Sequence, residues 1–565
     1  MKKFLLLLLL SMALMHIPAG AQTAAVDTVK RYWVQFTDKK NSPYSVSSPS
    51  AFLSPRAIQR RLNHGIAIDV RDLPVNPAYI DSLQAKGAHI HCKSKWLNGA
   101  VVKVANPGII AAISKLPFVS DTTSVMPLTP FANDGSASQK LDVKVSQQTP
   151  PLELTHSNSS LNYGNSYNQI NMLKGVCLHD AGFQGQGMII AILDAGFYHA
   201  DQRTAFDSLR AHNQIITTWD FVAENSQVYE NHFHGMCVLS CMGGNLPGQL
   251  IGTAPKAKYM LLRTEQDSTE FVIEEYNWAA GAEFADSAGA DVINTSLGYT
   301  TFDNARQSHT YADMNGHKTI AARAANCAAN KGLAVVCAAG NEGGGPWNYV
   351  GTPGDADSVL AVGAVNPSGG FASFSSHGPN SSGMVKPSVA AQGQSSVVAD
   401  WNSNGTVLEN GTSFASPILC GMVACLWQAH PQISNMQLFK YIEQSANQYT
   451  HPDTLLGYGI PDFCAANLSM GVQEQADISH DFLSGLYPNP FSDSFDFIYW
   501  SRATQQVDVR LFDLSGREVK SEKRSVSAGS YNSFQLNGLS VLPGGFYLLS
   551  VRTASGSVQR KIIKQ

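Results

Sequence analysis

The stretch Gly411-Thr412-Ser413-Phe414-Ala415-Ser416-Pro417 has the form of a serine presented at the start of a buried helix. Apart from Gln428, the residues from Ser413 to Ala429 are small or apolar, which predicts a helix that is buried on all sides. Pro417 would break the interior of a helix, but a proline is tolerated in the first turn, where its missing N–H has no intrahelical partner. The stretch therefore predicts a buried helix that begins at Ser413.

The hydroxyl of Ser413 needs assistance before it can react. An unassisted serine is a poor nucleophile at neutral pH, and an imidazole must take its proton during attack on a carbonyl. A buried carboxylate then orients the imidazole and stabilises the imidazolium that forms. His234, in His234-Gly235-Met236-Cys237-Val238, and Asp194, in Ile192-Leu193-Asp194-Ala195-Gly196, supply these two groups. We therefore predict Asp194, His234 and Ser413 as a catalytic triad.

Two apolar runs place these polar residues at the ends of strands. Met188–Leu193 and Gly332–Ala339 are continuously apolar, which is typical of buried parallel strands. Asp194 follows the first run, and Gly340-Asn341 follows the second. Open α/β sheets place ligands at the carboxyl ends of their strands, so we expect both polar sites to face one crevice.

The order of these motifs along the chain, with Asp before His, Asn and Ser, resembles the subtilisin-like serine peptidases. The resemblance implies an α/β fold with a doubly wound parallel sheet, and a serine endopeptidase that hydrolyses peptide bonds in protein or peptide substrates through an acyl-enzyme. It also implies that the side chain of Asn341 and the backbone N–H of Ser413 stabilise the oxyanion, a contribution of about 100- to 1000-fold in turnover for such a side-chain donor. The residues implied to line the first specificity pocket are Ser296, Leu297, Gly298, Ala338, Ala339 and Gly340.

The chain departs from the family pattern at two places. The family usually has Ser or Thr after the catalytic Asp, whereas Ala195 follows here, so a hydroxyl that could support the carboxylate is missing. The helix expected after His234 carries Met236, Leu239 and Ser240 where the family favours smaller residues. Asp291–Gly298 resembles the family strand whose edge pairs with an extended substrate, a mode that favours peptides.

Other interpretations of the same residues remain open. A lone Ser in such a turn is usually a helix N-cap, and a lone Asp after a strand is commonly a turn residue. His232 and His234 could form a metal pair, although no third ligand lies at zinc-site spacing. The G-x-S-x-G elbow of an α/β-hydrolase is absent. The rival function is a surface binding or adhesive protein on an inactive peptidase scaffold.

The N-terminal part reads as an export signal followed by a small domain. Residues 1–21 have a basic start, an apolar run and a small-residue A-x-A end, which predicts a signal peptide. No later apolar run approaches the ~20 residues that span a bilayer. Residues 22–149 predict a small α+β domain that resembles the inhibitory propeptide of subtilisin-like peptidases, with a permanent N-terminal binding domain as the alternative. The polar stretch 130–169 indicates an exposed linker, which we place at 150–161.

The remaining chain divides into a core and a tail. Residues 162–470 alternate apolar strands with helical stretches, which predicts the parallel-sheet domain. A polar link, 471–485, precedes residues 486–565, where period-two alternation predicts a β-sandwich.

Motifs in this tail resemble the C-terminal sorting domain of type IX secretion: Tyr487-Pro488-Asn489-Pro490-Phe491, Leu511–Arg517, Gly544-Gly545-Phe546-Tyr547 and a basic end. That implies passage through the periplasm, recognition by the type IX machinery, and release or display at the cell surface. An ordinary carbohydrate-binding or structural sandwich is the alternative.

Composition agrees with an exported globular protein. The formal net charge is -4 and 15% of residues are charged, so no basic field suggests nucleic acid. Export permits disulfides among the nine cysteines, but pairing cannot be assigned from the sequence, and several cysteines fall at positions where a free thiol acts as a small hydrophobe. No cofactor is implied. Calcium stabilises some such folds, but the sequence places no ligands for it.

Overall fold

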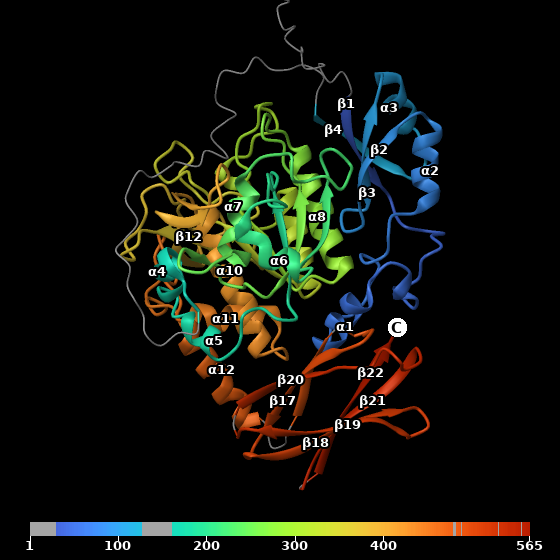
Figure 1. Cartoon of the computed structure of the whole chain (residues 1–565). Coiled ribbons are helices and arrows are strands. Elements are labelled where there is room, and N and C mark those ends of the chain that lie inside the picture. The colour runs from blue at the N-terminus through green and yellow to red at the C-terminus, as the bar shows by residue number, and fades with distance from the viewer. Residues whose placement is uncertain (1–29, 127–160, 478–481, 488, 529, 555) are drawn as a thin grey trace, which may run out of the picture.

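A computed structural model describes residues 30–126, 161–477, 482–487, 489–528, 530–554 and 556–565 (Figure 1). The predicted signal peptide, 1–21, and nearly all of the predicted linker, 150–161, lie outside the described residues. Figure 1 shows a blue N-terminal unit beside the central body and a red C-terminal unit at its base.

The N-terminal unit is a four-stranded antiparallel sheet with three helices. The strand order is β2-β3-β1-β4, with β1 (Lys30–Phe36), β2 (His89–Ser94), β3 (Gly99–Val104) and β4 (Val119–Met126). The helices are α1 (Pro55–Asn63), α2 (Pro77–Ala85) and α3 (Pro107–Ile113). Each helix begins with a proline and is capped by a preceding Ser or Asn side chain, so the sequence fixes where each one starts.

The central body is built on a seven-stranded, all-parallel sheet in the order β13-β12-β11-β10-β5-β9-β6. The parallel sheet expected from the sequence is therefore confirmed. The strands are β5 (Ile189–Asp194), β6 (Ile215–Asp220), β9 (Lys258–Arg263), β10 (Val292–Thr295), β11 (Ala334–Ala338), β12 (Leu360–Val365) and β13 (Val389–Gln392).

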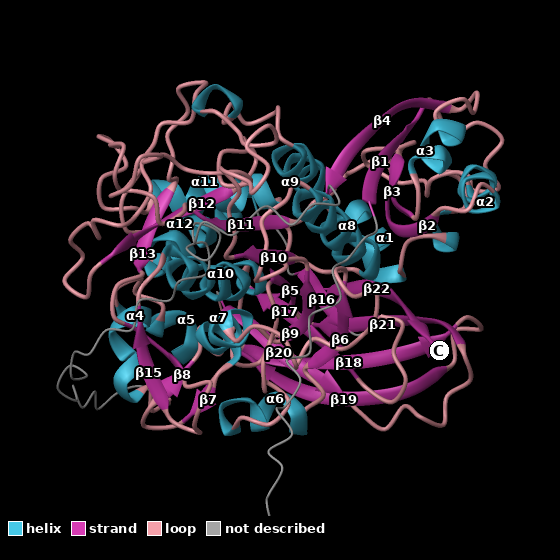
Figure 2. Ribbon diagram, turned by 90° about the horizontal axis from the view of Figure 1, so that it is seen from above, coloured by secondary structure: helices cyan, strands magenta, loops and turns pink. Residues whose placement is uncertain are grey.

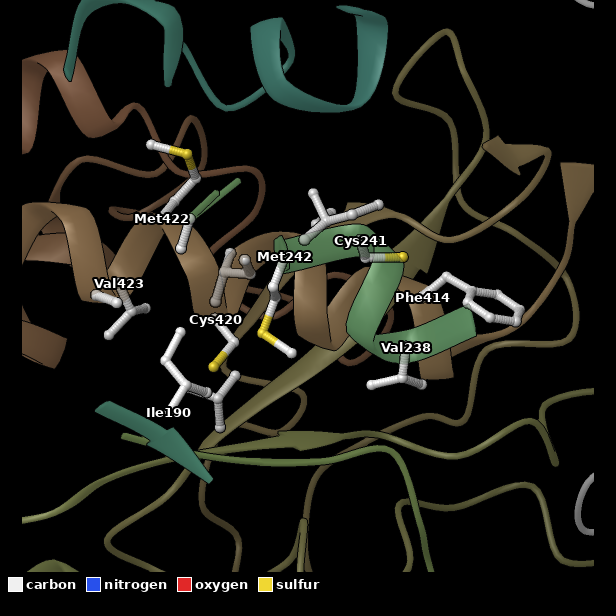
Figure 3. Packing of buried hydrophobic residues seen from close by; sticks show 14 of the residues in the cluster. Ile190, Val238, Cys241, Met242, Phe414, Cys420, Met422 and Val423 are labelled. Carbon is white, nitrogen blue, oxygen red and sulfur yellow. The ribbon is translucent and has the colours of Figure 1, made fainter. Parts of the chain in front are cut away.

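Helices cover both faces of this sheet (Figure 2). On one face lie α7 (His234–Gly243) and α10 (Thr412–Ala429), and on the other lie α8 (Ile273–Ala288) and α9 (Ile320–Asn330). Strand β5 alternates between the two cores: Ile190 and Ile192 pack with α7 and α10, whereas Ala191 and Leu193 pack with α8 and α9. A strand buried on both faces must be apolar at every position, which explains the continuous apolar run. Figure 3 shows the α7 and α10 side of this packing.

Further elements complete the body. They are α4 (Tyr167–Asn171), α5 (Val176–Asp180), α6 (Asp207–Ala211), α11 (Asn435–Gln444), α12 (Phe463–Asp477), the pair β7 (Asn245–Leu246) and β8 (Leu250–Ile251), the hairpin β14 (Ser396–Ala399) and β15 (Thr406–Glu409), and short 3-10 turns. A disulfide between Cys177 and Cys464 joins α5 to α12 across 287 residues of sequence. Among the described residues the other seven cysteines are free, and six of these are buried.

Among the described residues, parts of two segments expected as linkers contain helices or strands: 161–169 at the end of the first, and 471–477 and 482–485 in the second. Within 130–169, Tyr163, Ser166 and Gln169 are buried, and the Tyr163 hydroxyl bonds to Nδ1 of His179 at 2.8 Å. A few docking side chains in a polar stretch are enough to hold a short helix against the body. In the predicted link 471–485, α12 continues to Asp477 and the next strand begins at Phe482.

The C-terminal unit contains two antiparallel sheets. One has the order β16-β17-β20 and the other β19-β18-β21-β22. Alternate residues of the two sheets, such as Phe497, Tyr499, Val509 and Leu549, enter one shared apolar core. The strands are β16 (Phe482–Tyr487), β17 (Phe495–Ser501), β18 (Gln505–Asp513), β19 (Glu518–Val526), β20 (Ser530–Leu536), β21 (Gly545–Thr553) and β22 (Gly556–Lys564).

Candidate active site

The ends of three neighbouring strands bring the predicted residues to one edge of the sheet. Strands β5, β10 and β11 are adjacent and parallel, so Asp194, Ser296 and the Gly340-Asn341 pair leave the sheet at its carboxyl edge. Helix α10 packs against β10 and β11 and presents Ser413 in its first turn. The sheet topology therefore explains how residues 219 positions apart come together.

Asp194 and His234 form a buried hydrogen-bonded pair. His234 Nδ1 lies 2.8 Å from Asp194 Oδ1, which also accepts from the backbone N–H of Ala195 at 2.8 Å. His234 begins α7, and the next residue must be glycine, because a Cβ at Gly235 would lie 2.4 Å from the carbonyl oxygen of Gly196. The bond at Nδ1 fixes the orientation of the imidazole and leaves Nε2 for a proton transfer.

The second carboxyl oxygen of Asp194 lacks the support that a hydroxyl at residue 195 could give. Asp194 Oδ2 is buried and has no hydrogen-bond partner among the described residues. A hydroxyl at position 195 is the group that the family pattern would supply, and Ala195 has none.

Ser413 lies at the second residue of α10, where its backbone N–H has no intrahelical acceptor. Its Oγ donates to the carbonyl oxygen of Ser296 at 3.3 Å, and no hydrogen bond joins it to His234 among the described residues. Catalytic hydrogen bonds are often long before substrate binds. Helices α7 and α10 pack directly on one another, which keeps the two side chains on adjacent elements.

Asn341 is held with its amide group turned toward the site. Its Oδ1 accepts from both the backbone N–H and the Oγ1 of Thr412, at 2.9 and 3.0 Å. With the oxygen occupied in this way, the amide nitrogen is the atom left to donate. Asn341 also lines the pocket beside Ser413.

A pocket of about 170 Å³ lies beside Ser413. It is lined by five of the six predicted pocket residues, Ser296, Leu297, Gly298, Ala338 and Gly340, together with Asn341 and Ser413. The sixth, Ala339, does not line it; its backbone N–H donates to the carbonyl oxygen of Val362. The structure adds Thr300, Glu342, Gly351, Phe374, Asn410 and Thr412. Asn410 directly precedes the serine motif and Thr412 lies within it, so both could have been found there.

Glu342 is the ionisable member of this lining set. Its carboxyl is partly buried at the wall of the pocket, and this burial raises its pKa. The signal for it in the sequence was its position directly after Asn341.

Two details of the sequence interpretation were wrong. Pro417 is the sixth residue of α10 and lies inside the helix, because the helix begins at Thr412. Strand β10 is interior, paired with β5 on one side and β11 on the other, so a substrate could pair only with the segment 296–298 beyond its end.

The side chain of His232 contacts the backbone of His234. Its Nδ1 accepts from the backbone N–H of His234 at 3.2 Å, and burial lowers the pKa of His232. Within the part of the chain that the structure describes, no group of three or more His, Cys, Asp or Glu side chains could hold a metal ion. Helix α10 is also long and apolar enough to cross a membrane, but 94% of that window is buried inside the body.

Comparison with known proteins identifies all three units. Residues 185–459 match the subtilase family, residues 31–141 match the peptidase S8 propeptide domain of Bacteroidota, and residues 485–565 match a secretion system C-terminal sorting domain. Subtilisin of Bacillus pumilus is 30% identical over 301 residues, which cover 53% of this chain and 97% of that protein. The chain therefore belongs to the subtilase family.

Two further comparisons give the extent of the similarity. Subtilisin E of Bacillus subtilis (strain 168) is 32% identical over 281 residues, and the chain spans 65% of its length. The crystal structure of MycP1 from the ESX-1 type VII secretion system covers 57% of this chain and 91% of its own, with 22% identity and a TM-score of 0.43. The sorting domain directs the chain to the cell surface or the extracellular space.

Proposed function

We propose that this protein is a secreted serine endopeptidase that hydrolyses peptide bonds with Asp194, His234 and Ser413. The observation that carries the proposal is the buried Asp194–His234 pair at 2.8 Å, next to the helix that presents Ser413 beside a pocket. Activity, substrates and partners are proposals, because the chain spans only 65% of the first relatives it matches.

In the proposed reaction, Ser413 Oγ attacks the substrate carbonyl while His234 Nε2 takes its proton. Asp194 stabilises the imidazolium through Nδ1. The tetrahedral oxyanion lies between the amide nitrogen of Asn341 and the backbone N–H of Ser413. His234 then gives its proton to the leaving amine, and water releases the acyl group by the reverse route. Each proton and charge is handled by these groups, so we assign no cofactor to the reaction.

We propose that protein or peptide substrates bind along the segment 296–298, with one side chain in the pocket formed by Ser296, Leu297, Gly298, Ala338 and Gly340. Main-chain pairing there would fix the scissile carbonyl over Ser413 and favours extended peptides over small esters.

We propose that the N-terminal unit, 22–149, is an inhibitory propeptide bound to the body, 162–470, and joined to it by a processed linker near 150–161. The contact is extensive and charged. Glu283 on α8 accepts from Ser94 Oγ and from the backbone N–H groups of Lys95 and Trp96, and Asp286 pairs with Arg60, Arg61 and Lys95. These groups are buried together, so the two units bind as a specific complex.

We propose that residues 486–565 form a β-sandwich that the type IX secretion machinery recognises and removes on export. The two sheets around one shared core support this arrangement. We propose no partner role for nucleic acid.

The test is reaction of Ser413 with a fluorophosphonate probe, because labelling requires an activated nucleophile. We expect the purified mature protein to be labelled and to hydrolyse casein. Ser413→Ala should lose both properties, and His234→Ala should lose nearly as much, since triad members act as a unit. Undiminished hydrolysis by Ser413→Ala would falsify the assignment, and unlabelled but folded parent protein would favour the binding-scaffold alternative.

A further inference from the structure

Helix α10 lacks one backbone hydrogen bond, the one that would end at the carbonyl oxygen of Ser413, whose hydroxyl is the proposed nucleophile. Pro417 has no N–H, and in an α-helix that N–H would donate to the carbonyl of the residue four positions earlier, which is Ser413. The Ser413 carbonyl is buried, and a buried carbonyl without a donor costs free energy comparable to a lost hydrogen bond.

Ser296 supplies the missing donor. Its Oγ donates to the Ser413 carbonyl oxygen at 2.8 Å, while Ser413 Oγ donates to the Ser296 carbonyl oxygen at 3.3 Å. The two serines are therefore joined by a reciprocal pair of hydrogen bonds between the end of β10 and the first turn of α10.

Asn294 completes a buried network behind this pair. Its amide nitrogen donates to Ser296 Oγ at 3.2 Å, and its Oδ1 accepts from Ser416 Oγ at 3.0 Å. Asn294 and Ser416 are both fully buried. Asn294 thus fixes the direction of the Ser296 hydroxyl and is itself anchored to α10, one turn beyond the nucleophile.

We propose that Asn294 and Ser296 are positioning residues that set the location of Ser413 by replacing the helical hydrogen bond that Pro417 removes. Asn294 lines no part of the pocket, and Ser296 acts here through its contact with α10 in addition to lining the pocket. The inference rests on the proposed peptidase function. It assigns a role in turnover to a residue that was expected only to bind substrate.

The kinetic test separates positioning from substrate binding. Ser296→Ala should lower kcat by about 10-fold with little change in KM, because a small misplacement of the attacking atom is costly while ground-state binding is kept. Asn294→Ala should lower kcat similarly, and the double variant should lose no more than the worse single variant, since the two residues act as one unit. A rise in KM alone for Ser296→Ala would overturn the proposal.

Rescue and control variants make the test independent of folding. Pro417→Ala, placed in the Ser296→Ala background, restores a backbone N–H to the Ser413 carbonyl and should recover most of the lost kcat. Ser296→Thr keeps a hydroxyl and should stay near the parent. Thr295→Val is the matched control: it removes the buried hydrogen bond from Trp278 Nε1 to Thr295 Oγ1 on the same strand but touches neither serine, so it should leave kcat unchanged.

The rate of fluorophosphonate labelling serves as a second readout that needs no peptide substrate. The labelling rate should fall in Ser296→Ala and should recover when Pro417→Ala is added to that variant. Labelling of the parent together with unchanged rates in both single variants would overturn the positioning role alone, whereas an unlabelled parent would overturn the proposed function. If Asn294→Ala fails to fold, the Ser296→Ala and Pro417→Ala pair decides the question.

Discussion

Glu409, four residues before Ser413, is a buried acid at the end of β15. Both of its carboxyl oxygens are buried, and burial raises its pKa from 4.5 to about 7. The unfolded chain releases this proton near 4.5, so the folded state binds it more tightly. Stability from this group is therefore fully present below pH 4.5 and is lost as pH rises through 7.

We expect Glu409→Gln to remove this pH dependence, because an amide cannot ionise. The free energy of unfolding of the variant, relative to the parent, should increase as pH rises from 4.5 to 7 and then level off. Urea unfolding at several pH values measures it, with exposed Glu230→Gln as the control. A difference that stays constant over this range would show that Glu409 is ionised in the folded protein.

Asn341 gives a second test at the residue scale. Asn341→Ala should lower turnover by about 100- to 1000-fold with little change in KM, because the contact strengthens only as the oxyanion develops. Asn341→Asp is the matched variant, since it keeps the oxygen that accepts from Thr412 but loses the amide donor. Both variants should be equally slow. A rise in KM alone would make Asn341 a substrate-binding residue instead.

At the scale of elements, the sequence predicted the parts of the site that lie at the ends of buried strands. Asp194 and Asn341 follow short continuous apolar runs, which are typical of strands covered on both faces. Phe374 and Gly351 could not be predicted, because they reach the pocket from loops whose course depends on the whole fold. The Cys177–Cys464 pairing depends on the packing of α5 against α12. This is a tertiary contact, so the residues around each cysteine do not predict it.

The contact between α1 and the body offers a test of the propeptide role. Arg56 donates to the carbonyl oxygens of Gly289 at 2.9 Å and Gly187 at 2.7 Å and pairs with Asp291, so all three of these contacts cross to the body. The separately produced segment 22–149 should inhibit the mature enzyme at micromolar concentration or below. Arg56→Ala in that segment should weaken inhibition by about 10-fold or more, because the substitution leaves the carboxylate of Asp291 without its ion-pair partner at the interface.

Lys86→Ala is the control for this interface, since Lys86 is an exposed residue at the C-terminal end of α2, and no hydrogen bond or ion pair joins its side chain to the body among the described residues. Titration of both variants against active enzyme gives the comparison. Equal weakening by the two substitutions would place the effect in the fold of the segment, and absence of inhibition by the parent segment would favour a permanent N-terminal domain.

At the scale of the whole molecule, each of the three units has a core of its own. The N-terminal sheet, the central body and the C-terminal unit contribute separate buried clusters, although the body core on the α8 side also takes in N-terminal residues such as Trp33. The C-terminal unit meets α1 and the base of the body around a cavity of about 430 Å³ lined by residues that include Arg56, Trp427 and Ile498. That junction shares no lining residue with the pocket at Ser413.

Removal of the C-terminal unit should therefore separate export from catalysis. Strand β16 begins at Phe482, so truncation after residue 481 removes whole strands and leaves α12 intact. The purified truncated enzyme should keep its turnover, because every residue of the proposed triad and oxyanion site lies in the body, which has its own core. In cells the truncated chain should accumulate in the periplasm while the full chain is released. The location of both chains is measured by fractionation of a native-type host. Full-length Ser413→Ala is the control for self-processing, and mass spectrometry locates the mature C-terminus. Equal secretion of full and truncated chains would rule out the sorting role and leave the unit as a binding module.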